Sequence, residues 1–191
     1  EKMGLFKKDN HPISLSGRDR EFVRQTQRKT AESSVTLIRD NGKFFPLSCE
    51  KFKKIGVIPI THHEPSLKEA EYLCSLLGER GFEAVYLKDG IKREEFENYD
   101  LVLYALFSRP FRPMGFLDFH SSEAAKIAVS LQVGTEKTIV VSFGSPYFGN
   151  QYFERALTYV NAYSMLSPSV EAFVKAAAGE IPFSSFSPVK L

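Results

Sequence analysis

Apolar stretches of strand length alternate with amphipathic helical stretches along this chain, and that alternation restricts the fold more than any other feature. The strand-like stretches are rich in β-branched and aromatic residues and lie at 35–38, 54–60, 82–87, 100–107, 137–143 and 157–163. Helical periodicity occupies 18–33, 67–80, 92–98, 121–133 and 168–178. Strands that are apolar throughout are buried on both faces, and parallel strands need crossover connections of helix length. We therefore expect an α/β fold: a mostly parallel five- or six-stranded sheet with helices on both faces, a flavodoxin-like α/β sandwich.

Local signals place some of the element ends. Ser66 is followed three residues later by Glu69, which is the spacing of a capping box at a helix start. Gly81 is expected to end that helix, and Cys74 lies in its apolar row as a small core residue. Cys74 and Cys49, the two cysteines, have neither metal-binding nor disulfide spacing.

Composition excludes several classes of function. The chain has 191 residues, is 43% hydrophobic and contains 17 Phe, so it can bury a substantial core within one domain. Its net charge is only +2, with Lys and Arg scattered among Asp and Glu, and this gives no electrostatic reason to expect nucleic acid as a partner. No apolar stretch has the length of a membrane-spanning helix. We expect neither a nucleic-acid partner nor a membrane-spanning segment.

Ligand sites on a parallel sheet gather at the carboxyl ends of the strands. Those ends lead here into 59–64, 108–120, 144–150 and 164–167. None carries the glycine-rich G-x-G-x-x-G or G-x-x-x-x-G-K-[ST] pattern that cradles phosphates. The sequence therefore predicts no nucleotide and no other cofactor.

A metal site is the first alternative for these loops. His62, His63 and Glu64 follow a strand directly, but zinc requires three or four convergent ligands, and adjacent histidines in an extended loop point apart. His11 and His120 are the remaining histidines, and no spacing ties them to this pair. We expect a solvated loop and no bound metal.

The loop 108–120 has the most unusual composition in the chain. Arg109, Phe111 and Arg112 stand among prolines after a central strand, which is typical of a rigid surface for another domain or the rim of a ligand site. A loop that packs its own Phe side chains over the sheet edge explains the same residues. Both interpretations remain open.

The loop 144–150 contains Ser145, Tyr147 and Phe148. Its Phe-Gly-Ser-Pro-Tyr sequence is not the G-x-S-x-G nucleophile elbow, and Pro146 has no backbone N–H to offer an oxyanion. We expect the Ser-Pro-Tyr turn to shape the upper edge of the sheet, and the two aromatic residues suit a domain interface or the rim of a ligand site. The carboxylates of these loops, Glu64 and Asp118, show no pairing, so no residue is assigned a catalytic role.

Three segments, in this order and spacing, resemble the second domain of glycoside hydrolase family 3. Residues 31–47 (AESSVTLIRDNGKFFPL) resemble the A-x-x-S-x-x-L-L-K-N-x-x-x-x-L-P-L motif with which the family enters this domain, and 141–147 (VSFGSPY) resemble its strand followed by S-P-Y. Residues 163–164, followed by 172–183, resemble its closing A-Y-S and G-E-x-P, although 185–189 (SFSPV) replace the usual G-K-L-P-V. Residues 3–6 resemble the end of the preceding barrel's last helix. The resemblance implies that 1–17 are the end of a barrel helix plus a linker, and that 18–191 are the α/β sandwich domain.

The S-P-Y turn with a short 108–120 loop resembles the β-N-acetylglucosaminidase branch of the family. This resemblance implies a parent β-N-acetylhexosaminidase that hydrolyses terminal N-acetylglucosamine, with its aspartate nucleophile and histidine acid/base on an N-terminal barrel outside this chain. The implied partners are that barrel and, through the full-length enzyme, the carbohydrate, and the chain alone is expected to be inactive. Two alternatives remain: a β-glucosidase-type domain of the family, and a flavodoxin-like binding module without catalysis of its own.

Overall fold

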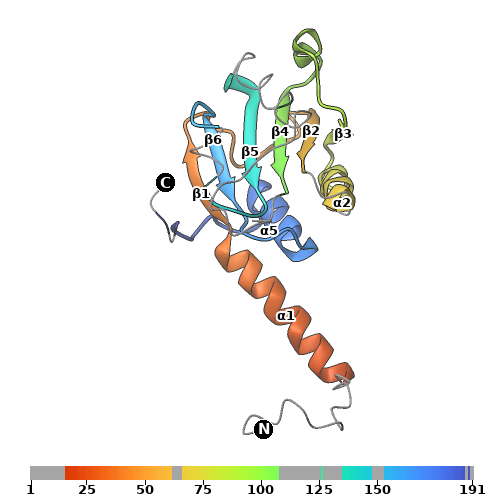
Figure 1. The fold of residues 1–191 in the computed structure, drawn as a ribbon, viewed down its shortest axis with the longest axis vertical. Helices are drawn as coiled ribbons and strands as arrows, with labels where there is room; N and C mark the ends of the chain where they lie inside the picture. The colour runs from red at the N-terminus through yellow and green to blue at the C-terminus, as the bar shows by residue number, and fades with distance from the viewer. Residues whose placement is uncertain are drawn as a thin grey trace, which may run out of the picture.

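The structure, a computed structural model, describes residues 16–61, 66–107, 126, 135–147, 153–187 and 189. Its centre is one six-stranded sheet with the strand order β1-β6-β5-β4-β2-β3 (Figure 1). The strands are β1 (Thr36–Asp40), β2 (Lys54–Ile60), β3 (Glu83–Tyr86), β4 (Leu101–Leu106), β5 (Thr138–Ser142) and β6 (Thr158–Asn161). The expected α/β class and the mostly parallel sheet are confirmed.

The exception to the parallel arrangement is β1. It runs antiparallel to β6, with Thr36 opposite Asn161, while the other four strand pairs are parallel. The amino end of β1 therefore lies at the edge of the sheet where the parallel strands have their carboxyl ends. We call this edge the carboxyl edge.

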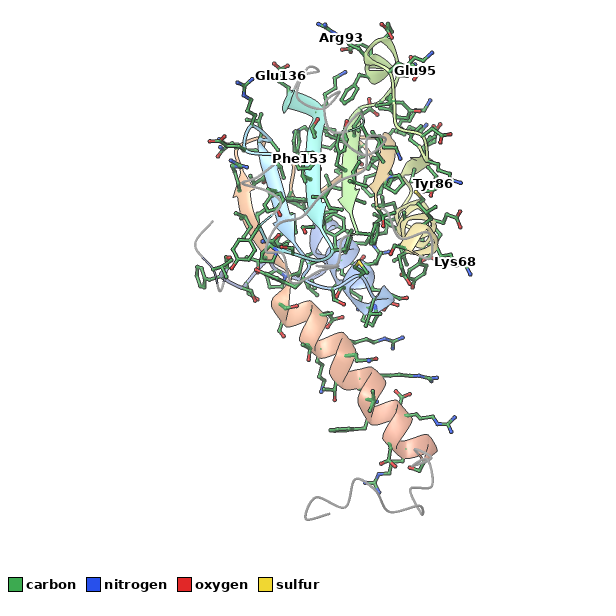
Figure 2. The ribbon with its side chains drawn as sticks, in the orientation of Figure 1. Lys68, Tyr86, Arg93, Glu95, Glu136 and Phe153 are labelled. Atoms are coloured by element: carbon green, nitrogen blue, oxygen red, sulfur yellow. The ribbon has the colours of Figure 1, made fainter. Side chains whose placement is uncertain are left out.

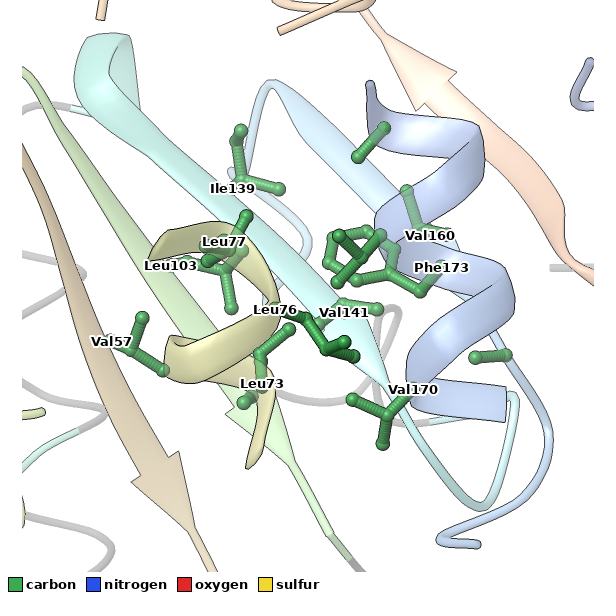
Figure 3. Packing of buried hydrophobic residues seen from close by; sticks show 14 of the residues in the cluster. Val57, Leu73, Leu76, Leu77, Leu103, Ile139, Val141, Val160, Val170 and Phe173 are labelled. Atoms are coloured by element: carbon green, nitrogen blue, oxygen red, sulfur yellow. The ribbon is translucent and has the colours of Figure 1, made fainter. Parts of the chain in front are cut away.

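Two helices, α2 (Leu67–Gly78) and α5 (Ser167–Ala177), cover one face of the sheet. Each turns an apolar side toward the strands, because its apolar residues recur every three to four positions. Figure 3 shows this packing, in which helix side chains meet strand side chains in one core; those labelled are Val57, Leu73, Leu76, Leu77, Leu103, Ile139, Val141, Val160, Val170 and Phe173.

The opposite face has a separate apolar core, in which the ring centroids of Tyr104 and Phe153 lie 5.7 Å apart. The 3₁₀ helix η2 (Arg93–Asn98) adds the buried Phe96 to it. Residue 126 is helical and lies over this face, since the Tyr104 hydroxyl donates a hydrogen bond to its carbonyl at 3.5 Å. The rest of the expected helix 121–133 lies outside the described residues. A second short 3₁₀ helix, η3 (Thr135–Lys137), precedes β5.

The first helix, α1 (Gly17–Ser34), extends away from the rest of the molecule beyond the carboxyl edge (Figure 1). A capping box holds its start: Asp19 N–H donates to Ser16 Oγ at 3.2 Å, and Ser16 N–H donates to Asp19 Oδ2 at 3.2 Å. Among the described residues, its last turns make the contact with the body, where Ala31 is buried against α5. α1 therefore joins the sheet through β1, at the carboxyl edge.

The capping box expected at Ser66 is wrong. Ser66 has helical backbone angles (φ −73°, ψ −12°) and makes no side-chain cap hydrogen bond. A capping residue needs an extended backbone instead. Glu69 accepts a hydrogen bond from Ser167 Oγ at 3.2 Å, which connects α2 to the start of α5. Gly81, at φ +86°, follows the helix end as expected.

Cys74 is partly buried against the core, as its place in the apolar row predicts. This burial, with Glu71 nearby, raises the pKa of its thiol to about 11. The thiol therefore stays protonated at neutral pH and behaves as a small apolar side chain.

Candidate functional site

The Ser-Pro-Tyr turn lies directly after β5 at the carboxyl edge, and the sheet beneath holds it in place. Ser142 Oγ donates to the Ser145 carbonyl at 2.7 Å, and the Tyr159 hydroxyl donates to the Pro146 carbonyl at 3.3 Å. Ser145 Oγ accepts the Tyr147 N–H at 3.4 Å, a contact within the turn. The Tyr147 side chain remains 53% exposed. This arrangement gives the Ser145 hydroxyl a structural role and presents an aromatic ring to whatever lies beyond the edge.

A buried amide lies beside this turn. Asn161, the last residue of β6, is fully buried, and neither its Oδ1 nor its Nδ2 has a hydrogen-bond partner among the described residues. Its cross-strand neighbours are Thr36 and Ser142, and residues that face each other in a sheet share one face. The three form a row of polar side chains, the polar row, at the carboxyl edge of this face.

Thr36, one of the three residues in this row, makes hydrogen bonds to residues outside it. Thr36 Oγ1 donates to the Ser34 carbonyl at 2.8 Å and accepts from the Tyr163 hydroxyl at 3.2 Å. Tyr163 has φ +59°, a left-handed conformation that a residue with a side chain rarely adopts. Strained backbone clusters at functional sites, and a buried polar group without a partner among the described residues calls for an explanation. Sequence reasoning missed Asn161; the available signal was an amide within an apolar strand, a residue type that is seldom fully buried.

Two of the segments that carry the family resemblance, 31–47 and 172–183, pack against each other just after β1. Leu47 N–H donates to the Ala177 carbonyl at 2.7 Å, and the Phe45 and Phe183 rings lie 5.0 Å apart. Gly179, at φ +79°, lies where an added Cβ would be 3.1 Å from Pro46, so the close approach favours glycine. The role of these segments is to close the domain.

A shallow apolar pocket of about 420 Å³ lies between these segments. Its polar groups are already engaged within the domain. Asp40 Oδ1 accepts the Phe44 N–H and the Thr158 hydroxyl at 3.1 and 2.9 Å. Glu180 accepts from Arg80 Nε at 2.5 Å, and this hydrogen bond lowers the pKa of the Glu180 carboxyl. The pocket therefore offers no free charged group for recognising a ligand.

The other predicted site residues divide by whether the structure describes them. Ser145 and Tyr147 lie at the carboxyl edge as expected, whereas Arg109, Phe111, Arg112 and Phe148 lie outside the described residues. The same holds for all four histidines, including His62 and His63. Within the described ranges, no group of three or more His, Cys, Asp or Glu side chains could hold a metal ion. Those ranges also contain no helix long and apolar enough to cross a membrane.

The fold defines a class of protein: a mostly parallel α/β domain whose carboxyl edge carries the polar row and the Ser-Pro-Tyr turn. No family model matches the chain. In sequence it is 24% identical, over 180 residues, to a β-N-acetylglucosaminidase/β-glucosidase of Cellulomonas fimi, with 86% of this chain and 31% of that protein covered.

Solved structures share the fold. β-Glucoside phosphorylase BglX bound to 2FGlc matches with a TM-score of 0.75 and 24% identity, covering 92% of this chain and 32% of that one. A glycoside hydrolase family 3 β-N-acetylglucosaminidase from Paenibacillus sp. str. FPU-7 matches with a TM-score of 0.58 and 20% identity, covering 90% and 34%. This chain therefore corresponds to about a third of each of these larger enzymes.

Proposed function

We propose that this chain is the C-terminal α/β domain of a glycoside hydrolase family 3 enzyme, and that it supports hydrolysis by an N-terminal barrel that holds the catalytic residues. One observation carries the proposal: nearly the whole chain matches about a third of enzymes of this kind, in sequence and in fold. The three family-like segments agree with it. Two of them close the domain, and the third forms the turn at the carboxyl edge.

For the substrate, we propose terminal N-acetylglucosamine residues, because the S-P-Y turn resembles the β-N-acetylglucosaminidase branch. The names of the similar proteins include both N-acetylglucosaminidase and β-glucosidase. A β-glucosidase-type parent is therefore the second candidate. Rates of the full-length enzyme on aryl N-acetyl-β-glucosaminide and aryl β-glucoside, compared as kcat/KM, separate the two. A larger value for the glucoside would refute the N-acetylglucosamine assignment.

The isolated chain is expected to fold and to show no turnover of either aryl glycoside, because the proposal places the nucleophile and the acid/base on the barrel. The measurement is release of the aryl alcohol by the repurified chain, with its folding monitored by circular dichroism. Activity that co-purifies with the folded chain and disappears when it is unfolded would contradict the proposal.

We further propose that the carboxyl edge contacts the barrel near its substrate pocket, through Tyr147 with Ser145 and, in the loops outside the described residues, Arg109, Phe111, Arg112 and Phe148. Tyr147 supports this because more than half of its side chain is exposed although the turn that carries it is anchored. A rigidly held, exposed aromatic ring loses little entropy on binding.

Replacing Tyr147 by alanine in the full-length enzyme is expected to cost about 1–3 kcal/mol in transition-state stabilisation or in stability of the domain contact. Steady-state kinetics measure the loss of transition-state stabilisation, and thermal melting measures the loss of stability. Arg93→Ala is the matched control, since Arg93 is exposed on η2, at the end of the sheet opposite α1 (Figure 2). If Tyr147→Ala and Arg93→Ala both behave like wild type, the barrel contact lies elsewhere.

A further inference from the structure

Exposed large apolar side chains gather at one end of the described part of the molecule. Tyr147 (53% exposed) and Leu166 (55%) lie in loops at the carboxyl edge, and Phe22 (70%) and Val23 (40%) lie on α1. Phe186 (93%) follows Ser185, whose hydroxyl contacts the Ser33 carbonyl at the end of α1. Single exposed apolar residues are normal on a protein surface, whereas a contiguous apolar patch marks an interaction surface. The outer surfaces of α2 and η2 contribute none to this set.

Two sides of α1 differ in what they contact. The inner side packs on α5 through Ala31, with Arg28 Nε 3.7 Å from Glu171 and Glu32 2.5 Å from Lys175 Nζ. At about 100° per residue, Phe22, Thr26 and Thr30 form one row and Val23 lies beside it, roughly opposite that inner side. We call these four residues the outer stripe of α1.

One of the two threonine hydroxyls of the outer stripe is bonded within the helix. Thr26 Oγ1 donates to the Phe22 carbonyl at 2.8 Å, within the helix, so its hydroxyl is already satisfied and its methyl group adds to the apolar surface. Every residue from Gly17 to Thr30 is nevertheless exposed. A polar helix of this length gains little stability from propensity alone, and most helices in proteins depend on packing of one side. Among the described residues, most of α1 therefore has no packing partner (Figure 2).

We propose that the outer stripe of α1 packs against the catalytic barrel that precedes this domain, so that α1 and the carboxyl edge contact the barrel together. This inference rests on the proposed function, which supplies the barrel. If the barrel precedes the domain, the polypeptide enters through α1, and this tether keeps the barrel at a high local concentration beside the helix. The similar enzymes are about three times as long as this chain, which leaves room for such a domain.

The test is hydrogen exchange of the backbone amides of residues 20–27, compared between the isolated chain and the full-length enzyme. In the isolated chain these amides are expected to exchange rapidly, because every residue from Gly17 to Thr30 is exposed. In the full-length enzyme they are expected to exchange at least about tenfold more slowly. Phe22→Ala in the full-length enzyme is expected to remove most of this protection, although alanine is the better helix former.

Arg24→Ala is the matched control, since Arg24 is exposed on the side of α1 away from the outer stripe, and it should leave the protection unchanged. Equal exchange in the two proteins, or equal effects of Phe22→Ala and Arg24→Ala, would overturn the inference while glycosidase activity still supported the proposed function. If the full-length protein shows no glycosidase activity but Phe22→Ala still removes the protection of these amides, the result would support the docking of α1 and refute the proposed function. Protection in the isolated chain that rises with its concentration would identify a second copy as the occupant and overturn the inference.

Discussion

Replacing Phe143 by alanine is expected to lower the free energy of unfolding of this chain by about 3–5 kcal/mol, a large part of what holds a domain of this size together. Phe143 is fully buried, and its ring stacks on that of Phe107 with centroids 4.7 Å apart and an interplanar angle of 7°. It also meets Phe173 of α5 edge to face, at 5.8 Å and 90°. The substitution therefore leaves a cavity where β4, β5 and α5 meet.

Urea denaturation followed by circular dichroism measures this loss. Phe22→Ala is the control, because it removes the same ring from a side chain that is 70% exposed. A substitution at such an exposed position should change the unfolding free energy by no more than about 0.5 kcal/mol. Equal midpoints for Phe143→Ala and wild type would show that the three rings do not form a tightly packed core.

The strands were predictable because their burial is encoded locally. A run such as 100–107 is apolar at almost every position. Its short length and its β-branched and aromatic content favour a strand covered on both faces. The predicted ends were less accurate, as in 157–163, of which only Thr158–Asn161 forms β6. Leu157 instead uses its carbonyl to accept Asn41 N–H at 2.8 Å, and Tyr163 adopts a positive φ. Both features depend on distant parts of the chain, which local pattern does not report.

The direction of β1 and the strand order were not predictable for the same reason. The sequence 35–40 has the composition of a strand, but its antiparallel pairing with β6 joins residues more than 100 positions apart. The pairing decides where α1 emerges, and so it decides that the outer stripe and the Ser-Pro-Tyr turn lie at the same edge. Tyr147 was recognised from its motif, whereas Asn161 required the fold, because only the sheet shows that Thr36 and Ser142 lie beside it.

Asn161 gives the second large expected effect. Asn161→Asp keeps the shape of the side chain but places a carboxyl group where neither amide atom has a partner among the described residues. Burial disfavours the ionised form, so the pKa of the new carboxyl in the folded protein rises above the ordinary value of about 3.9. An uncompensated buried charge costs about 3–5 kcal/mol, and this loss of stability is expected at neutral pH.

The pH dependence identifies the cause of that loss. Below the pKa of the unfolded chain, the new carboxyl is protonated in both states and costs little. As the pH rises from there, only the unfolded state ionises, and the variant loses about 1.4 kcal/mol per pH unit until the folded-state pKa is reached. The difference from wild type should therefore grow between pH 5 and pH 7 in urea denaturation. A difference that does not change with pH would show that the carboxyl is hydrated or paired.

Asn161→Leu separates the effect of the amide on stability from its effect on activity. Leucine has a similar size and no polar atoms. Removing a buried amide that has no partner among the described residues is expected to leave the unfolding free energy unchanged or to raise it by about 1–3 kcal/mol. Stabilising substitutions often lower activity where the activity depends on a destabilised site. In the full-length enzyme, the same variant should then keep or gain thermal stability and lose kcat/KM, which would make Asn161 part of the working edge of the domain. A variant that loses stability would show instead that the amide is paired in the native protein, and that the polar row serves folding alone.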